Sequence, residues 1–125
     1  MSKQIIIIGS CAALFAVLIG AFGAHTLNDL IASNDRLDAF STASKYHFYH
    51  SFALLFLGLI AIHVEKNYLL LAKWGFTIGI IIFSGSLYIL AITNISWLGA
   101  ITPIGGVCFI FAWVGVAMGV FRGKQ

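Results

Sequence analysis

Residues 5–24 read IIIIGSCAALFAVLIGAFGA, a run of twenty residues without a charged side chain. A helix of this length rises about 30 Å, which is the thickness of the hydrocarbon core of a bilayer. Comparable stretches follow at 46–64, 74–92 and 98–121. Hydrophobic residues make up 61% of the 125-residue chain and charged residues 9%, a composition typical of membrane proteins. We therefore expect a single all-α transmembrane domain over residues 1–125, an antiparallel bundle of four transmembrane helices.

The distribution of Lys and Arg predicts the orientation of this bundle. Basic residues are more frequent on the side of the two termini than on the opposite side, and cytoplasmic segments carry such an excess. Both termini are therefore expected in the cytoplasm of a cell membrane. The first stretch also resembles a signal peptide, but its length favours a retained span. The basic residues on the side of the termini are Lys3, Lys66, Lys73, Arg122 and Lys124, against Arg36 and Lys45.

Small residues recur at helical spacing along three of the spans. Lipid tails are as apolar as leucine, so close approach through Gly and Ala is the visible mark of a helix interface in a membrane. We expect these residues to pack the helices of one bundle; contact with a second copy or with another membrane protein is the alternative. The expected packing residues are Gly9, Ala13, Ala16, Gly20, Gly23, Gly75, Gly79, Gly105, Gly115 and Gly119.

Two further patterns concern the third span and the long first connection. In the third span one face carries Gly75, Gly79 and Ser86, while Thr77, Ser84 and Tyr88 point roughly opposite. The connection from 26 to 45 places its apolar residues on one helical face, which predicts a short amphipathic helix between the first two spans. Those apolar residues are Leu27, Leu30, Ile31, Leu37 and Phe40.

Polar side chains gather in the half of the spans that lies away from the termini. Intramembrane polar groups mark a functional site by default, and an antiparallel bundle could bring these together around one pocket. The alternative is that hydroxyls bond backbone carbonyls while the histidines lie among headgroups. The candidates for the pocket are His25, Tyr49, His50, Ser84, Tyr88 and Thr102.

A metal or haem site is a further hypothesis for the same region. His47 and His50 lie three residues apart on a helix, and His25 with Asp29 could add ligands. No acidic cluster supports the set, and this His spacing is common. We therefore expect no cofactor.

Four blocks of sequence resemble, in order, those of the YgdD and transmembrane-protein-256 family, also called domain of unknown function 423 and uncharacterised protein family 0382. The blocks are GAFGAH at 20–25, KYHFYHS at 45–51, FSGSLY at 83–88 and GAITPIGG at 99–106. The resemblance implies a small four-span protein of the bacterial cytoplasmic membrane without an established activity. His25 and His50 match the family blocks, whereas His47 departs from them, because Gln is frequent at that position.

The residues support one class of function over two others. No Ser/His/Asp, Cys/His or paired-carboxylate set lies at one depth, so we expect no enzymatic activity. The leading hypothesis is a non-enzymatic structural, assembly or interaction protein, with the lipid bilayer and a second copy or a membrane protein as partners and no nucleic acid. The alternative is a small transporter or channel for an ion or small molecule that uses the polar pocket. The first span lacks the acidic residue of small multidrug exporters.

Overall fold

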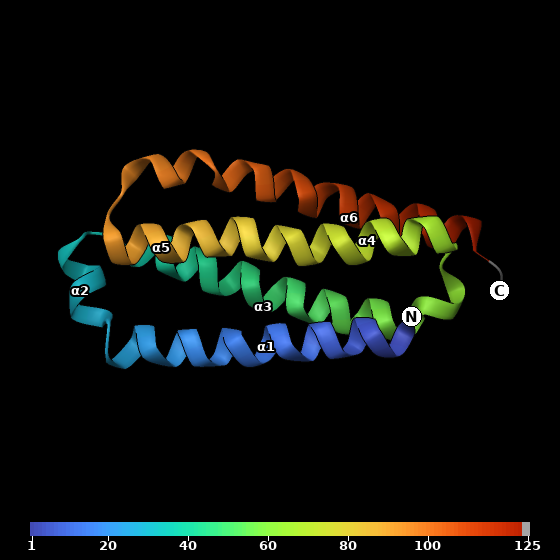
Figure 1. Cartoon of the computed structure of the whole chain (residues 1–125), viewed down its shortest axis with the longest axis horizontal. Helices are drawn as coiled ribbons and strands as arrows, with labels where there is room; N and C mark the ends of the chain where they lie inside the picture. The colour runs from blue at the N-terminus through green and yellow to red at the C-terminus, as the bar shows by residue number, and fades with distance from the viewer. Residues whose placement is uncertain (124–125) are drawn as a thin grey trace.

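The computed structural model describes residues 1–123, which are mostly helical and contain no strand (Figure 1). Within that range four helical segments are long and apolar enough to cross a membrane, Ser2–His25, Leu37–His63, Lys66–Thr93 and Ser96–Arg122. The expected four-helix membrane bundle is thereby confirmed. The elements in order are α1 (Ser2–His25), α2 (Asn28–Ser33), α3 (Leu37–Ile60), η1 (Ala61–His63), α4 (Lys66–Gly79), η2 (Ile80–Ser84), α5 (Gly85–Thr93), η3 (Ser96–Ala100) and α6 (Thr102–Arg122).

The spans are longer than the hydrophobic stretches that predict them. They contain 24 to 28 residues, a rise of about 36 to 42 Å against a hydrocarbon core of about 30 Å. The second begins at Leu37 rather than 46, and the third at Lys66 rather than 74. Hydropathy marks only the part of a helix in hydrocarbon, while the helix itself continues into the headgroup region with its backbone hydrogen bonds intact.

The expected short helix between the first two spans is present as α2, but it is shorter than the predicted amphipathic segment. Asp35 adopts a left-handed conformation with φ of 56°. Its amide donates to the Ala32 carbonyl, and the Arg36 amide donates to the Ile31 carbonyl, both at 3.0 Å. This bond pattern ends a helix. Apolar residues of the connection beyond this stop, including Leu37, therefore belong to α3.

The bundle consists of two helical hairpins. In the first, residues 2–63, α1 packs along α3; in the second, residues 66–122, α4 packs along α6. The hairpins meet where α3 lies against α4, η2 and α5. Figure 1 shows α1 and α6 as the outer helices, with the N-terminus and the end of α6 at the same end of the bundle. We call this the terminal end and the opposite one the connection end.

Small residues lie at the contacts inside each hairpin. A Cβ placed on Gly9 would be 3.0 Å from the Leu54 Cβ, so α1 closely approaches α3. A Cβ on Gly75 would be 2.7 Å from the Ala112 Cβ, so α4 closely approaches α6. These separations are shorter than ordinary van der Waals contact between carbon atoms. Gly9 and Gly75 therefore set the distance between the helices of each pair.

The third span contains a turn of π-helix, η2, between α4 and α5. A π turn holds one residue more than an α turn, so the helix that follows is rotated by about 100°. Ser84 at the end of η2 donates a hydrogen bond of 2.8 Å to the Ala43 carbonyl of α3. The wide turn thus lies against the other hairpin, near the middle of the span.

Candidate functional site

Polar side chains join the two hairpins to each other. Each bond in this set has one partner in residues 2–63 and the other in residues 66–122, whereas small residues line the contacts within hairpins. We call the set the polar seam. Its bonds are Lys73 Nζ to Gln4 Oε1 at 2.7 Å, Trp113 Nε1 to His50 Nε2 at 3.1 Å, Ser84 to the Ala43 carbonyl at 2.8 Å, Tyr88 with His47 at 2.9 Å, Asn34 Nδ2 to the Ala91 carbonyl at 3.0 Å and Arg36 Nε to Asn94 Oδ1 at 2.9 Å.

The hydrogen bonds of His50 define its protonation state. The Trp113 indole can only donate, so Nε2 of His50 accepts that bond and carries no proton. Nδ1 therefore bears the hydrogen and donates to the Tyr46 carbonyl at 2.8 Å. The ring also stacks on Phe109 with centroids 3.6 Å apart. His50 is a neutral, fully bonded packing residue here, and no lone pair is left for a metal.

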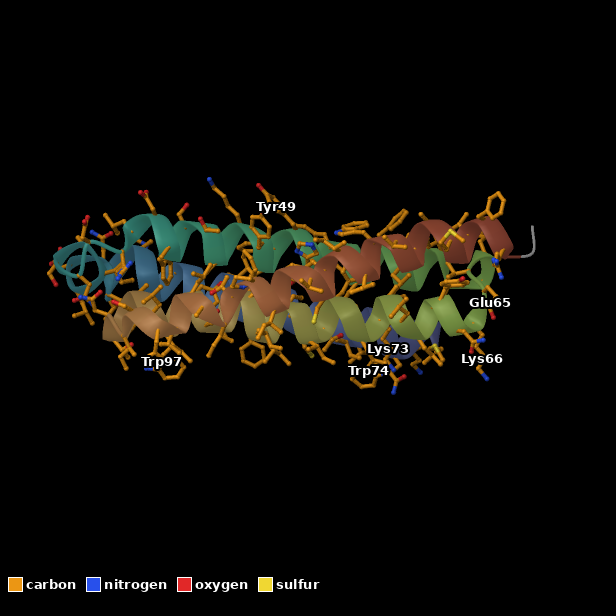
Figure 2. The ribbon with its side chains drawn as sticks, turned by 90° about the horizontal axis from the view of Figure 1, so that it is seen from above. Tyr49, Glu65, Lys66, Lys73, Trp74 and Trp97 are labelled. Atoms are coloured by element: carbon orange, nitrogen blue, oxygen red, sulfur yellow. The ribbon has the colours of Figure 1, made fainter. Side chains whose placement is uncertain are left out.

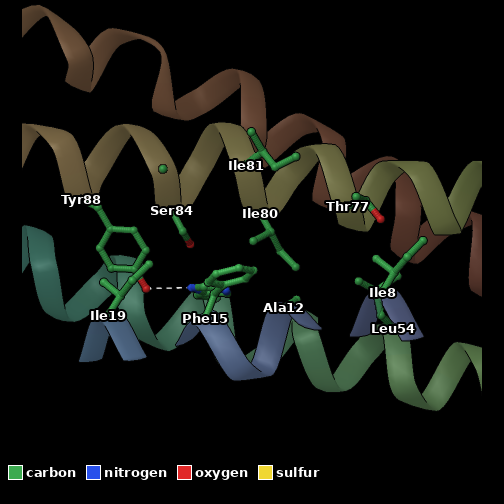
Figure 3. Close-up of a pocket in the computed structure, with 12 residues that line it drawn as sticks. Ile8, Ala12, Phe15, Ile19, Leu54, Thr77, Ile80, Ile81, Ser84 and Tyr88 are labelled. Atoms are coloured by element: carbon green, nitrogen blue, oxygen red, sulfur yellow. Dashed lines mark hydrogen bonds between the residues drawn. The ribbon is translucent and has the colours of Figure 1, made fainter. Parts of the chain in front are cut away.

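A groove runs between α1 and the third span, with α3 as its floor (Figure 3). Its volume is about 430 Å³. Its lining is mostly aliphatic, and the His47–Tyr88 hydrogen bond lies near one end with Thr77 near the other. The Thr77 hydroxyl donates to the Lys73 carbonyl. The main lining residues are Ile8, Ala12, Phe15 and Ile19 of α1, His47 and Leu54 of α3, and Thr77, Ile80, Ser84 and Tyr88 of the third span.

A second pocket, of about 610 Å³, lies between α3 and α6. Aromatic rings line most of it, so we call it the aromatic pocket. Tyr46 stacks on Phe83 with ring centroids 4.7 Å apart, and both rings border the pocket. The aromatic pocket also includes Tyr49, His50, Pro103, Phe109 and Trp113.

The six candidate polar residues do not share one pocket, which corrects that expectation. Ser84 and Tyr88 line the groove, whereas Tyr49 and His50 line the aromatic pocket. Thr102 instead shares a 2.6 Å hydrogen bond with Ser86 inside the second hairpin. His25 is exposed at the end of α1. Similar depth along the helices did not bring these side chains together, because their directions around the helix axes differ.

The expected packing residues lie mainly inside the hairpins. Gly9, Ala16 and Gly23 are buried in α1, and Ala13 and Gly20 are half-buried. Gly75 and Gly79 face α6, where a Cβ on Gly79 would be 2.5 Å from the Phe109 ring. The buried glycines of α6 face the third span or the turn before it; they are Gly105, Gly115 and Gly119.

Comparison with known proteins places the chain in a family. The model of the family described as "Protein of unknown function (DUF423)" matches residues 19–106. This chain belongs to the DUF423 family. A UPF0382 membrane protein of Staphylococcus aureus (strain bovine RF122) is 46% identical over 122 residues, 96% of this chain and 97% of the relative. UPF0382 membrane protein YwdK of Bacillus subtilis is 42% identical over 121 residues, 96% and 98% of the two chains. No solved structure matches significantly.

The membership confirms the resemblance of the four sequence blocks and the assignment as a membrane protein. The polar contacts of this DUF423 protein include three residues that the pattern analysis did not place in the pocket, His47, Ser86 and Trp113. Trp113 lies mid-span rather than at an interface, and an indole N–H inside a membrane needs an acceptor. The mid-span position of Trp113 was therefore the sequence signal that could have placed it among the polar contacts. Within residues 1–123 no three His, Cys, Asp or Glu side chains gather closely enough to hold a metal ion.

Proposed function

We propose that this DUF423 protein is a non-enzymatic protein of the cell membrane that acts by association with a second copy or with another membrane protein. The observation that carries the proposal is the outward face of α1. Only 17% of the α1 span is buried, against 33% to 50% in the other three. α1 packs along α3, contacts α4 through Gln4, and leaves a large part of its remaining circumference exposed.

The exposed face of α1 has the pattern of a helix-pairing surface. Five exposed residues recur at alternating four- and three-residue steps, the spacing of a left-handed helix pair, and three of them are small. We call them the α1 seam. The small-residue stripes of the first and fourth spans are already occupied within the hairpins, whereas the α1 seam remains exposed and could receive a partner helix. Its residues are Ser10, Leu14, Val17, Ala21 and Ala24.

Cross-linking in native membranes tests the association. Cys11 is exposed on α1 beside the α1 seam, and Cys108→Ser removes the second thiol. A bifunctional thiol reagent is expected to trap Cys11 in a dimer or in a product with a second protein. Ala21→Leu should lower the yield, because a larger side chain separates the helices. Ala117→Leu, the same change at an exposed position of α6, is the control.

Two outcomes would reject the association. Absence of any cross-linked product would show that α1 faces lipid alone. Equal yields for Ala21→Leu and Ala117→Leu would show that the α1 seam is not the contact surface.

The orientation is part of the proposal. Its support is the excess of Lys and Arg on the side of the termini, which predicts that both termini lie in the cytoplasm. A reporter that is active only outside the cytoplasm should be silent after Gln125 and active when inserted after Asn34. The reverse pattern would place the connection end in the cytoplasm.

Transport is a second candidate, and the polar seam favours it. The hairpins meet through polar bonds and form a groove with an imidazole–phenol pair, so separation along the polar seam would open a partly polar path. Proton entry into liposomes containing the protein, followed with a pH-sensitive dye, tests this. Flux equal to that of empty liposomes supports association. Flux that falls on His47→Ala would favour transport.

A further inference from the structure

One charged side chain is buried among the described residues, that of Lys73. It lies in α4, seven residues after Lys66, or about 10 Å along the helix from the terminal end. Its exposed fraction is 4%. Its ammonium donates to Gln4 Oε1 at 2.7 Å and lies 4.7 Å from the centroid of the Trp74 ring. Figure 2 places Lys66, Lys73 and Trp74 along one edge of the bundle.

No side-chain carboxylate of the chain can neutralise Lys73. Three of the four acidic residues, Asp29, Asp35 and Asp38, belong to the connection end. The fourth, Glu65, precedes Lys73 by eight residues, about 12 Å of helix rise, and accepts a hydrogen bond from the Tyr68 amide. Gln4 satisfies one of the three ammonium donors. Burial of an uncompensated charge is costly, so an anion from outside the chain would stabilise Lys73 in this position.

Lys73 and Gln4 also continue the line of the groove. Thr77 follows Lys73 by four residues and Ile8 follows Gln4 by four, and residues at this spacing share a helix face. Thr77 and Ile8 both line the groove. The Lys73–Gln4 pair therefore lies one helical turn beyond the groove, toward the terminal end.

The chemistry and direction of the groove suit an acyl chain that enters from the terminal end. The groove begins at Thr77, about 6 Å of helix rise beyond Lys73, and continues past the middle of the third span to Tyr88, so a longer acyl chain reaches further along it. The lining is aliphatic and aromatic over most of this length. A buried cationic group beyond the end of a long apolar groove is complementary to an anionic lipid, which has a negative phosphate next to its acyl chains. Lipid phosphates lie at the level where the spans leave the hydrocarbon.

We propose that Lys73 and Gln4 bind the phosphate of an anionic phospholipid in the leaflet at the terminal end, and that one acyl chain of this lipid occupies the groove. The exposed amines of Lys66 and Lys3 flank the same end and attract anionic headgroups to it. The site is independent of association through the α1 seam.

Native mass spectrometry of the purified full chain tests the headgroup. Phosphatidylglycerol and phosphatidylcholine with identical acyl chains are offered in equal amounts, and phosphatidylglycerol is expected to give at least about ten times more adduct. Lys73→Met keeps an unbranched stem and removes the charge, so it should abolish this preference. Lys66→Met removes an exposed lysine of the same helix face and should leave most of the preference for phosphatidylglycerol. Equal binding of both lipids, or equal loss in the two variants, would overturn the site.

Two further variants keep the test decisive if Lys73→Met does not fold. Gln4→Leu retains the lysine but removes its one protein acceptor and one polar contact of the phosphate. Binding should therefore weaken while the preference for phosphatidylglycerol remains, and loss of that preference would overturn the assignment of the phosphate to the Lys73 charge. Gly85 lines the groove, and a Cβ there meets no atom within 4 Å. Gly85→Leu should therefore fold and reduce binding of 18-carbon chains relative to 14-carbon chains. If the ratio of bound 18-carbon lipid to bound 14-carbon lipid is unchanged, the acyl chain does not lie in the groove. Stronger binding of free oleate than of phosphatidylglycerol would show that the site prefers a carboxylate to a phosphate headgroup.

Discussion

A change of Gly105 to Ala is expected to separate α6 from the π turn of the third span. A Cβ at Gly105 would lie 2.7 Å from the Cβ of Phe83 and 2.8 Å from its Cα. The second of these atoms is backbone, so no change of rotamer can relieve the contact. The helices must move apart, and the hydrogen bond between Ser86 and Thr102 lies in the same interface.

The neighbouring Gly106 provides a matched control. A Cβ there would be 3.9 Å from the nearest atoms of the Phe83 ring, which is ordinary contact. Both substitutions lie in α6 and gain the same intrinsic helix propensity, up to about 1 kcal/mol. That gain cancels in the comparison. The remaining difference is the cost of overpacking, about 1 to 3 kcal/mol. Gly105→Ala should therefore be about 2 kcal/mol less stable than Gly106→Ala.

Equilibrium unfolding in mixed micelles measures this difference. The purified variants are titrated with a denaturing detergent, and helix content is followed by circular dichroism. If the two variants differ by less than about 0.5 kcal/mol, the close contact between α6 and η2 does not exist in the protein, and the packing account of these glycines is wrong.

Three further predictions use the same titration. Trp113→Phe removes the donor to the buried His50 Nε2 and should destabilise the protein by about 1 to 3 kcal/mol; no loss would show that this bond is absent. His47→Gln keeps a hydrogen-bonding group for the Tyr88 hydroxyl and should cost less than His47→Leu, by about 1 kcal/mol or more; equal costs would contradict this pairing. Asp35→Val places a β-branched residue at φ of 56° and should cost about 1 to 2 kcal/mol, whereas Asp35→Gly should not destabilise.

The fold was largely accessible from the sequence because hydrophobic length is a local property. Each apolar stretch predicts its own span, and the short connections make neighbouring spans antiparallel. The two faces expected for the third span are also confirmed: Gly75 and Gly79 face α6, while Thr77 and Tyr88 line the groove. The extension of α3 back to Leu37 was not visible, because a helix in the headgroup region needs no apolar run.

The candidate site was less accessible, since it depends on how the helices are turned relative to one another. Depth along a helix follows from residue number, but direction depends on the partner that each face meets. His47 and His50 lie about 60° apart around α3, and this angle suffices to send one ring to the groove and the other to the aromatic pocket.

The division into two hairpins has a consequence for how the chain is made. The small-residue interfaces join neighbours in sequence, so each pair can close as soon as its two helices are in the bilayer. The polar seam cannot form at this stage, because the partners of Gln4 and His47 are residues that are synthesised later. A half-finished protein therefore leaves Gln4 without its partner and presents the His47 imidazole to hydrocarbon, so we expect membrane quality control to recognise it until the second hairpin covers these groups.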